Sequence, residues 1–565
     1  MSPFSPADRS KLTPYVTSTE GDVFAVKNLE GIVGAVYARY SRAATGFRET
    51  LLKEFVEEGH INAAKAGDLI ERVLVAYGDD SVGELEGAHV SFENVSILAT
   101  KEIEDRRIGG SPIEKSTRYV LYDERGPDGN FRYYRDPDVL ASEHGPAYIE
   151  TMDLIFQTYA DLVGPMQDYY KKLKPIEIAE YDINGDGAKE TLAALKDDAD
   201  LKAFKRTYNA DIRTKACDTL RYLLPIATLT NVGVFGNGRF FQNVLTSLYS
   251  ADLPEARRLA ESAQRELDQI MPRYVKRAKR QEYAVNNRER MKKLAAEMFV
   301  GIAPIEEPPV TLVDRGEDAM AAKLGGELAM SADALRGALR DEEDDLLLSC
   351  MLYQFTVHPL RQIRDIVRQL KPEQKQRLIE AYVGARQTRR DRPGRAFEAG
   401  YPYTFDLATD FGTYKDLMRH RMTTQLRQKF TPLHGFVMPP DLEAAGFANQ
   451  AKLCSEKAAE LYNRLTPDFP EQASYATLHG SKVRFIMGLN DREASHLIEL
   501  RTTPQGHPSY RKVCQEMHKA IAARSPWRAA VIRFADHNDY FWSRAASEAR
   551  QRSEERELDK RQGLI

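Results

Sequence analysis

The feature that most constrains this 565-residue chain is a short layout of residues that occurs twice. Near the C-terminal end, Tyr403-Thr-Phe is followed by thirteen residues and then by Arg419-His420-Arg421. Near the N-terminal end, Val90-Ser-Phe is followed by thirteen residues and then by Arg106-Arg107-Ile108. The shared order and spacing indicate two diverged copies of one domain. The length favours the same conclusion, because a chain this long exceeds one ordinary core.

Composition excludes several classes of protein. The chain is 42% hydrophobic and 29% charged, with a formal net charge of -4, which argues against bulk nucleic-acid binding. No C-x-x-C spacing occurs, so we expect buried reduced thiols rather than a metal site at Cys217, Cys350, Cys454 and Cys514. The N-terminus lacks a signal-peptide pattern, and no apolar run approaches the roughly 18 residues of a membrane span. We therefore expect a cytoplasmic protein.

A proline-containing segment divides the chain into nearly equal halves. Gly301–Pro309 contains three prolines and has no apolar periodicity, which is typical of an extended linker. We expect an N-terminal repeat over residues 1–299, a linker over 300–310 and a C-terminal repeat over 311–565. Within these repeats, residues 167–210 are interpreted as an insertion, and the charged tail from Ser543 is expected to be an exposed helix.

Periodicity and breakers predict the local structure around the two copies. We expect helices over Leu51–Tyr77 and Ala251–Met271. Strands are expected to begin at Val90–Phe92 and Tyr403–Phe405, which follow turn-forming residues. Thr413–Gln428 has few breakers, so we predict a helix there with the Arg-His-Arg triplet inside it.

In the first copy, the equivalent helix is expected to stop near Gly109-Gly110, because glycine is favoured just past a helix end. The following residues, Ser111 to Arg118, would then form a loop with free backbone amides. Such a loop is suited to holding a phosphate.

Three groups of residues are candidates for chemistry. Arg419, His420 and Arg421 are consecutive, so on a helix they would point in three directions about 100° apart. Guanidinium groups suit phosphate or carbonyl oxygens, although a solvated basic face is the favoured explanation when the triplet is taken alone. In the first half, Glu114, Ser116 and Arg118 alternate, which places them on one side of an extended chain. They offer a carboxylate, a hydroxyl and a guanidinium, and the alternative is an ordinary turn with a salt bridge.

The third pattern, Asn-x-Arg-x-x-x-(Asn/His), occurs once in each half. It reads Asn237-Gly-Arg239-Phe-Phe-Gln-Asn243 and Asn490-Asp-Arg492-Glu-Ala-Ser-His496. On a helix, the Arg and the second Asn or His lie one turn apart and can converge on one ligand. Beyond the second copy lies Arg501, whose counterpart in the first copy is Leu248.

Two further segments are ambiguous. Arg386 to Arg395 contains five arginines in ten residues, which suits either a solvated loop or contact with a polyanion such as a folate tail or a nucleic acid. Asp182-Ile-Asn-Gly-Asp-Gly187 begins like a calcium loop, but position twelve is Ala193 rather than a bidentate glutamate. A polar turn is the expected structure there.

Taken together, these motifs resemble the flavin-dependent thymidylate synthases, in two tandem copies covering most of both halves. The hallmark of that family is Arg-His-Arg, seven residues, Ser, any residue and Arg. It follows a strand ending Phe-Thr-Phe and precedes an Asn-x-Arg-x-x-x-Asn motif. The resemblance implies an α+β protein of two homologous domains, each a mixed β-sheet flanked by helices.

Neither half keeps the whole hallmark. The C-terminal half has the intact triplet, but Lys429 and Thr431 stand where the family has Ser and Arg. The N-terminal half keeps Ser116 and Arg118, while its triplet is altered. The family's nucleotide-binding Arg matches Arg221, four residues before Pro225, and its counterpart in the C-terminal half is Ser474. The His of the family's Glu-His pair has no clear match.

The losses are complementary, so the resemblance implies one composite site and one dead site. The nucleotide would be bound by residues from both halves, with Arg501 also catalytic: Glu114, Ser116, Arg118, Arg221, Arg419 and Arg501. Flavin would be bound by a second set: Ser41, Asn237, Arg239, Asn243, Arg419, His420, Arg421, Asn490, Arg492 and His496.

By resemblance, the expected reaction is the reductive methylation of dUMP to dTMP, with FAD as cofactor and with methylenetetrahydrofolate and NADPH as cosubstrates. Fusion of two copies suggests a homodimer in place of the family's homotetramer. One rival is a flavin- and folate-dependent methylase or hydroxymethylase of another uracil nucleotide or of nucleic acid. The other is a non-catalytic flavin- or nucleotide-binding homologue, since fold alone does not fix function.

Overall fold

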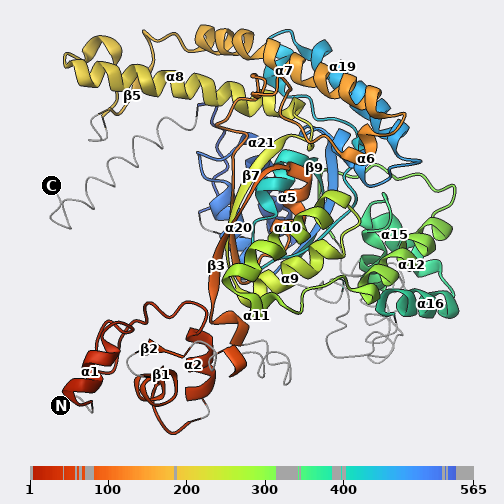
Figure 1. Cartoon of the computed structure of the whole chain (residues 1–565). Helices are drawn as coiled ribbons and strands as arrows, with labels where there is room; N and C mark the ends of the chain where they lie inside the picture. The colour runs from red at the N-terminus through yellow and green to blue at the C-terminus, as the bar shows by residue number, and fades with distance from the viewer. Residues whose placement is uncertain are drawn as a thin grey trace. The chain divides into compact units, whose positions relative to one another are not determined.

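The structure, a computed structural model, describes residues 4–41, 43–57, 60–62, 67–69, 82–183, 188–313, 342, 345–384, 396, 403–524, 529, 532 and 534–542. Figure 1 shows the helices and strands coloured by residue number. The chain forms two compact units, whose segments alternate along the sequence. Unit 1 comprises Met1–Lys115 and Thr230–Val285, and unit 2 comprises Ser116–Leu229 and Asn286–Ile565. These units do not coincide with the expected repeats over 1–299 and 311–565, whose boundaries remain predictions.

Unit 1 is built around a three-stranded sheet with the strand order β3-β7-β4. Helices α5, α9 and α10 pack against one another and against this sheet. The elements are α1 (Pro6–Leu12), α2 (Val33–Tyr40), α3 (Phe47–Thr50), the π-helix η1 (Leu51–Phe55), β1 (Val56–Glu57), β2 (His60–Ile61), η3 (Val82–Glu84), β3 (Gly87–Ser96), α5 (Ile97–Glu104), β4 (Gly110–Glu114), β7 (Leu229–Asn237), α9 (Gly238–Tyr249), α10 (Pro254–Ile270), α11 (Pro272–Val275) and the start of α12 (Glu282–Met298).

Unit 2 is built around a four-stranded antiparallel sheet with the order β10-β11-β9-β8. Its elements before α12 are α6 (Pro137–Leu140), α7 (Gly145–Leu173), β5 (Glu180–Tyr181), β6 (Glu190–Thr191), η4 (Leu192–Ala194), α8 (Asp198–Leu220) and η5 (Arg221–Leu223). Its elements after α12 are β8 (Val310–Leu312), α15 (Leu360–Gln369), α16 (Pro372–Val383), β9 (Tyr403–Asp410), α17 (Phe411–Leu417), β10 (Thr424–Arg427), η7 (Pro432–His434), α18 (Pro440–Ala444), α19 (Ala448–Leu465), η8 (Gln472–Ala476), β11 (Lys482–Leu489), α20 (Asp491–Arg501) and α21 (Pro508–Arg524).

The two sheets have the same topology, which explains the repeated sequence layout. In each repeat, a strand leads into a short helix and an edge strand, and a later strand inserts between the two. The order is therefore β3-β7-β4 in one repeat and β9-β11-β10 in the other. Even the pairing is equivalent, because the Lys115 N–H donates to Asn231 O at 2.9 Å and the Gln428 N–H donates to Arg484 O at 3.0 Å.

Polar caps start the equivalent helices. Asn237 caps α9 by accepting from the Phe240 N–H, and Asn490 caps α20 by accepting from the Glu493 N–H. An Asn side chain at this position satisfies one of the unpaired donors in the first turn of a helix. The duplicated Asn of the Asn-x-Arg pattern therefore has a structural role in both repeats.

The expected strand starts and the α10 helix are confirmed, since β3 spans Val90–Phe92, β9 begins at Tyr403 and α10 is Pro254–Ile270. The helix expected over Thr413–Gln428 is wrong. α17 ends at Leu417, the triplet lies in the turn that follows, and Thr424–Arg427 is a strand paired with β11. Thr423 and Thr424 are β-branched, and the long-range ladder outweighs the absence of helix breakers.

Two expectations in the N-terminal half are also corrected. Leu51–Tyr77 is not one helix, because η1 ends at Phe55 and β1 pairs antiparallel with β2. The loop expected from Ser111 to Arg118 begins later, because Gly110–Glu114 is strand β4, paired with β7. Its backbone is therefore engaged in a sheet. The preceding helix ends at Glu104, and Gly109 adopts a left-handed conformation with φ of 85°.

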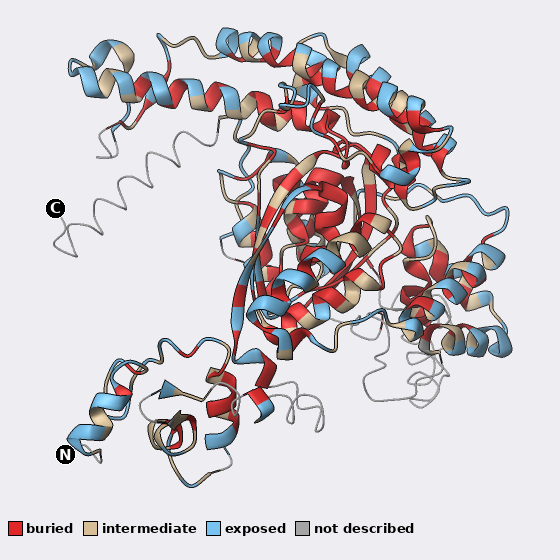
Figure 2. Cartoon of the chain, viewed as in Figure 1, coloured by how far each residue is buried: buried red, intermediate tan, exposed pale blue. Residues whose placement is uncertain are grey.

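The C-terminal sheet is covered on the face that carries Leu426 and Ile486. Both side chains pack into a cluster contributed by α12, α15, α16 and the helical segment before α15. Figure 2 shows the buried stripes of the unit 2 helices α7 and α8, which pack against each other. Amphipathic helices of this kind bury one stripe and leave the other in solvent.

Equivalent segments of the two repeats pair with each other inside unit 2. Pro225 and Leu478 form an antiparallel bridge. On either side, the Ile226 N–H donates to Thr477 O and the His479 N–H donates to Leu224 O, both at 2.8 Å. A local two-fold axis relates these two hydrogen bonds, because each segment donates one and accepts one. The two copies are therefore joined by main-chain hydrogen bonds as well as by the linker.

Several smaller expectations can be checked in the part of the chain that is described. All four cysteines are buried and unpaired with one another. No group of three metal-ligating side chains and no helix long and apolar enough to cross a membrane occurs among the described residues. Residues Asn184 to Gly187 of the calcium-like loop, the arginine-rich segment Arg386 to Arg395 and the tail from Ser543 lie outside the described residues.

Candidate active site

Arg118 is held beside the C-terminal end of α8 by a bidentate ion pair. Its Nε and Nη2 donate to the two Asp218 carboxylate oxygens at 2.7 and 2.8 Å. Burial alone would raise the pKa of Asp218, but the Arg118 cation outweighs it and holds that pKa well below its usual range. Asp218 is therefore ionised and fixes the orientation of the guanidinium.

Arg221 follows α8 directly and is almost fully buried, with 3% of its side chain exposed. Its Nη1 lies 3.6 Å from the Asp416 Oδ2. Its Nε and Nη2 are buried and have no hydrogen-bond partner among the described residues. The guanidinium lies against Gly412, where a Cβ would sit 2.8 Å from Nη2. Buried donors without partners are costly, so they indicate a place for a ligand.

Arg501, at the end of α20, flanks the same tyrosine as Arg118. The Arg501 Cζ lies 5.5 Å from the Tyr510 ring centroid, and the Arg118 Cζ lies 6.0 Å from it. Arginines stack favourably on aromatic faces. One tyrosine ring thus brings together a guanidinium from each repeat.

His420, the middle residue of the triplet, orients Arg501. The Arg501 Nε donates to His420 Nε2 at 2.9 Å, so Nδ1 carries the proton and donates to Glu493 Oε1 at 2.8 Å. Burial lowers the pKa of His420, and the neighbouring Arg501 lowers it further against the opposing effect of Glu493. The imidazole is therefore neutral near pH 7.

We call Arg118, Arg221 and Arg501, with Asp218, Asp416 and Tyr510, the arginine cluster. Asp416 lies among all three arginines. Burial would raise its pKa, but Arg221, Arg118 and Arg501 together lower it. His507 lies beside the cluster, and burial and Arg221 depress its pKa strongly. The cluster contains three arginines and two ionised carboxylates and is suited to an anion.

Comparison with known families identifies the scaffold. The family model described as thymidylate synthase complementing protein matches residues 30–273 and 350–527. The chain belongs to the thymidylate synthase complementing protein family. The two matched segments correspond to the two sheets with shared topology, so the chain is an α+β protein with two homologous domains of this flavin-dependent family.

Similar proteins extend over nearly the whole chain. A UPF0159 protein of Chlamydia muridarum is 33% identical over 97% of this chain and 99% of its own length. A UPF0159 protein of Chlamydia pneumoniae is 34% identical over 97% of this chain and 98% of its own. The UPF0159 protein Ta1429 of Thermoplasma acidophilum is 31% identical over 92% of this chain and 98% of its own. The tandem arrangement is therefore matched along almost its full length.

The residues expected to bind nucleotide belong to both units. Arg118, Arg221 and Arg501 meet in the cluster. Glu114 is instead a buried acceptor in unit 1, where Lys101 donates to it at 3.1 Å and Thr100 at 3.3 Å. Ser116 accepts from the Arg118 N–H at 3.2 Å and so shapes the turn that carries Arg118. The alternation of Glu114, Ser116 and Arg118 in the sequence did not predict the buried partner of Glu114, Lys101.

The outer residues of the triplet are less buried than His420. Arg419 is half-buried and Arg421 is exposed, both in the turn after α17. Because the triplet is not helical, the expected directions 100° apart do not apply. The middle residue, His420, accepts the hydrogen bond from Arg501 of the cluster.

The residues expected to bind flavin are distributed over both units. In unit 1, the Ser41 hydroxyl donates to Ala38 O, Arg239 forms an ion pair with Glu84, and Asn243 is exposed on α9. In unit 2, His496 is exposed on α20, with its ring 5.6 Å from that of His420. The side chain of Arg492 lies outside the described residues.

Sequence reasoning missed the acidic and aromatic members of the cluster. Asp218 and Asp416 each lie three residues before a predicted functional arginine, Arg221 and Arg419 respectively. The only local indication of these carboxylates was an acidic residue three positions before an arginine. That spacing is common on helices. No local pattern in the sequence predicts that the Tyr510 ring lies against both Arg118 and Arg501.

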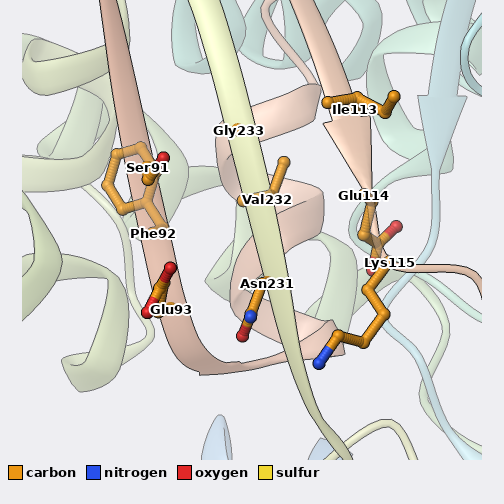
Figure 3. A pocket seen from close by; sticks show the side chains of 9 residues that line it. All are labelled: Ser91, Phe92, Glu93, Ile113, Glu114, Lys115, Asn231, Val232 and Gly233. Carbon is orange, nitrogen blue, oxygen red and sulfur yellow. The ribbon is translucent and has the colours of Figure 1, made fainter.

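A separate hollow lies on unit 1, over the sheet (Figure 3). It has a volume of about 330 Å³ and is lined by residues of β3, β4 and β7, among them Glu93, Ile113, Asn231 and Gly233, and by Lys115, which follows β4. In the equivalent pairing of the other repeat, Gly233 is replaced by Ile486 and Ile113 by Leu426, both buried in the core. Glycine in place of isoleucine helps to leave the hollow open.

Proposed function

We propose that this chain is an FAD-dependent thymidylate synthase, which methylates dUMP to dTMP with methylenetetrahydrofolate and NADPH. The observation that supports this most is the arginine cluster. Arg118 and Arg221 come from the N-terminal repeat and Arg501 comes from the C-terminal repeat. Two buried nitrogens of Arg221 lack partners among the described residues.

In this proposal, the arginines position the nucleotide and stabilise negative charge that develops on the pyrimidine. Arg221 donates its two unpartnered N–H groups to the phosphate, a geometry that guanidinium suits. Arg501 contacts the reacting ring, and neutral His420 holds the Arg501 Nε in place. Glu114 shares the buried Lys101 with Glu104, and its expected part in nucleotide binding remains a proposal, together with that of Ser116.

The cofactor in this proposal is FAD, which when bound carries the hydride needed to reduce the transferred carbon to a methyl group. The amide groups of Asn237 and Asn490 keep their N–H₂ donors available, because each helix cap uses only the side-chain oxygen. These donors fit flavin oxygens or phosphates. The proposed flavin residues also include Ser41, Arg239, Asn243, Arg419, Arg421, Arg492 and His496.

The counterparts of the cluster arginines in the opposite repeat carry no charge. Thr431 and Ser474 of the C-terminal repeat stand where Arg118 and Arg221 would be expected, and Leu248 of the N-terminal repeat stands where Arg501 would be expected. One composite site per chain is therefore proposed to be active, in a homodimer.

Substitutions in the cluster test the proposal. Arg501→Ala should abolish dUMP binding to the FAD-loaded protein, and Arg221→Ala should weaken it by about 10- to 100-fold, since hydrogen bonds to charged groups contribute about 1.5–3 kcal/mol. Arg464→Ala, which removes an exposed arginine of α19, is the control and should bind normally. Binding is followed by the change in the flavin spectrum on adding dUMP, and turnover by formation of dTMP.

Three outcomes separate this proposal from its rivals. Protein that takes up no FAD would favour a non-catalytic homologue. Protein that binds FAD but ignores dUMP would favour another uracil nucleotide or a nucleic acid as substrate. Unchanged dUMP binding by Arg501→Ala would contradict the composite site itself.

A further inference from the structure

A chain of two hydrogen bonds ends on Arg501 of the arginine cluster. The Arg501 Nε donates to His420 Nε2 at 2.9 Å, and His420 Nδ1 donates to Glu493 Oε1 at 2.8 Å. His420 and Glu493 are each 5% exposed, whereas Arg501 is half-buried. The chain therefore runs from a buried carboxylate, through a buried imidazole, to a guanidinium at the edge of the core.

Glu493 decides which nitrogen of His420 carries the proton. It is the third residue of α20, a position where a glutamate commonly caps its own helix, but here its Oε1 accepts from His420. A ring nitrogen that donates to a carboxylate fixes the tautomer of a histidine. With the proton on Nδ1, Nε2 carries a lone pair, which is what the N–H donor of Arg501 requires.

The groups around His420 favour this neutral form. Helix α20 contributes the charged or titratable groups that face the ring, and Arg419 and Arg421 flank it in its own turn: the α20 groups are Glu493, His496 and Arg501. Burial lowers the pKa of His420, Glu493 raises it, and Arg501 lowers it again. A protonated ring would have an N–H on both nitrogens and could no longer accept from Arg501.

All three residues of this chain are replaced together in the other repeat. By the shared sequence layouts, Phe240 stands in the place of Glu493, Arg107 in that of His420 and Leu248 in that of Arg501. The replacements cannot form an equivalent chain, because phenylalanine and leucine have no polar side-chain atom and arginine has no acceptor. Joint replacement is expected of residues that act as one unit.

We infer that Glu493 is a positioning residue for Arg501: it accepts the hydrogen bond from His420 Nδ1, fixes the tautomer whose Nε2 accepts from Arg501, and thereby holds the guanidinium in the orientation that meets the nucleotide. This inference rests on the proposed function, because it takes Arg501 to contact the nucleotide. It adds a residue that lies outside the sets expected to bind nucleotide or flavin.

Two substitutions at Glu493 provide the first test. Glu493→Leu removes the acceptor and should weaken dUMP binding to the FAD-loaded protein by about tenfold near pH 7, the order expected when a buried donor loses its partner. Glu493→Gln keeps an acceptor oxygen and should bind dUMP within about threefold of the wild type. Glu499→Gln is the control, because it removes the same charge from the same helix at a carboxylate that accepts from the Phe534 N–H. Equal weakening by both Glu493 variants, or normal binding by Glu493→Leu, would contradict the inference.

The pH dependence provides a second test that does not need Glu493→Leu to fold. Nitrogen NMR of nucleotide-free protein with isotopically labelled histidine should show the neutral His420 ring protonated on Nδ1. In Glu493→Gln, this ring should take up its second proton at a lower pH than in the wild type, because the carboxylate that favours the imidazolium is gone.

The affinity for dUMP should follow that change. The affinity of Glu493→Gln relative to the wild type should rise as the pH falls through the wild-type midpoint of His420, and this ratio cancels the titration of the dUMP phosphate itself. A neutral ring protonated on Nε2, or a ratio that stays constant across that midpoint, would overturn the inference.

Failure of this inference is distinguishable from failure of the proposed function. If the wild type binds FAD but no dUMP, the proposed function fails and the inference fails with it. If the wild type binds and methylates dUMP while the two Glu493 variants behave alike, only the positioning role fails.

Discussion

Buried histidines surround the arginine cluster, and their protonation is set by the neighbouring cations. His507 donates from Nε2 to the Asp218 carbonyl and accepts the Ser509 N–H at Nδ1, which is the pattern of a neutral ring. Burial, followed by Arg221, depresses its pKa well below the ordinary value. His420 has a lowered pKa for the same main reason, burial. Neutral histidines let the arginines dominate the charge of the site.

Stability should therefore fall on acidification. The unfolded chain binds protons at His507 and His420 near pH 6.5, whereas the folded chain resists them. The contribution is complete above pH 6.5 and is lost as the pH falls toward the lowered pKa values, by up to about 1.4 kcal/mol per pH unit for each histidine. Chemical denaturation between pH 5 and 7 measures this slope. His507→Gln should reduce it, and an unchanged slope in that variant would contradict the assignment.

At the scale of elements, each repeat has a hydrogen bond between a serine hydroxyl and a carboxylate at the start of a helix. The two residue types occupy opposite positions in the two repeats. Ser96 starts α5, and its N–H and hydroxyl donate to the Glu255 carboxylate on α10 at 2.8 and 2.6 Å. Asp410 starts α17 and accepts from the Ser509 hydroxyl on α21. The hydroxyl is therefore on the capping residue in the N-terminal repeat and on the partner helix in the C-terminal repeat, and the carboxylate is in the opposite position.

This exchange predicts compensation between two substitutions. Ser96→Asp alone should destabilise the protein by about 2–4 kcal/mol, because it sets two buried carboxylates against each other. The double variant Ser96→Asp/Glu255→Ser, which copies the C-terminal arrangement, should recover most of that loss. Thermal unfolding of the wild type and of both variants tests this, and a double variant no more stable than the single one would argue against equivalence.

The sequence predicted the elements whose signals are local. The starts of β3 and β9 follow turn residues and are rich in β-formers, and α10 has strong amphipathic periodicity. The triplet was misplaced on a helix because β10 exists only through its ladder with β11, almost sixty residues later. For the same reason, Arg118, Arg221 and Arg501 could be chosen by family resemblance, but their partners Asp218 and Asp416 could not. Such pairs arise from tertiary packing, which no local pattern encodes.

At the scale of the whole molecule, the repeats and the compact units divide the chain differently. Segment 116–229 belongs to the N-terminal repeat by sequence but to unit 2 by packing. It provides Arg118 and Arg221 to the cluster and pairs with the C-terminal repeat at Pro225 and Leu478. Unit 2 is therefore complete only when both repeats are present.

Cutting the chain in the linker should expose this dependence. Fragment 311–565 alone should unfold without cooperativity and bind no nucleotide, because it lacks two of the three cluster arginines and one side of the main-chain pairing. Co-expression of 1–299 with 311–565 should restore a complex that copurifies and binds dUMP. Calorimetry and size-exclusion chromatography test this. A cooperatively folded 311–565 fragment would contradict it.

The two-fold pairing around Pro225 and Leu478 also bears on how such a gene can change. If an ancestral chain used this contact between identical subunits, fusion made it permanent, and each copy was then released from carrying every functional residue. In the proposed composite site, each arginine lost from one copy is supplied by the other. Once both copies had lost different ones, neither could be deleted, and the duplication became irreversible.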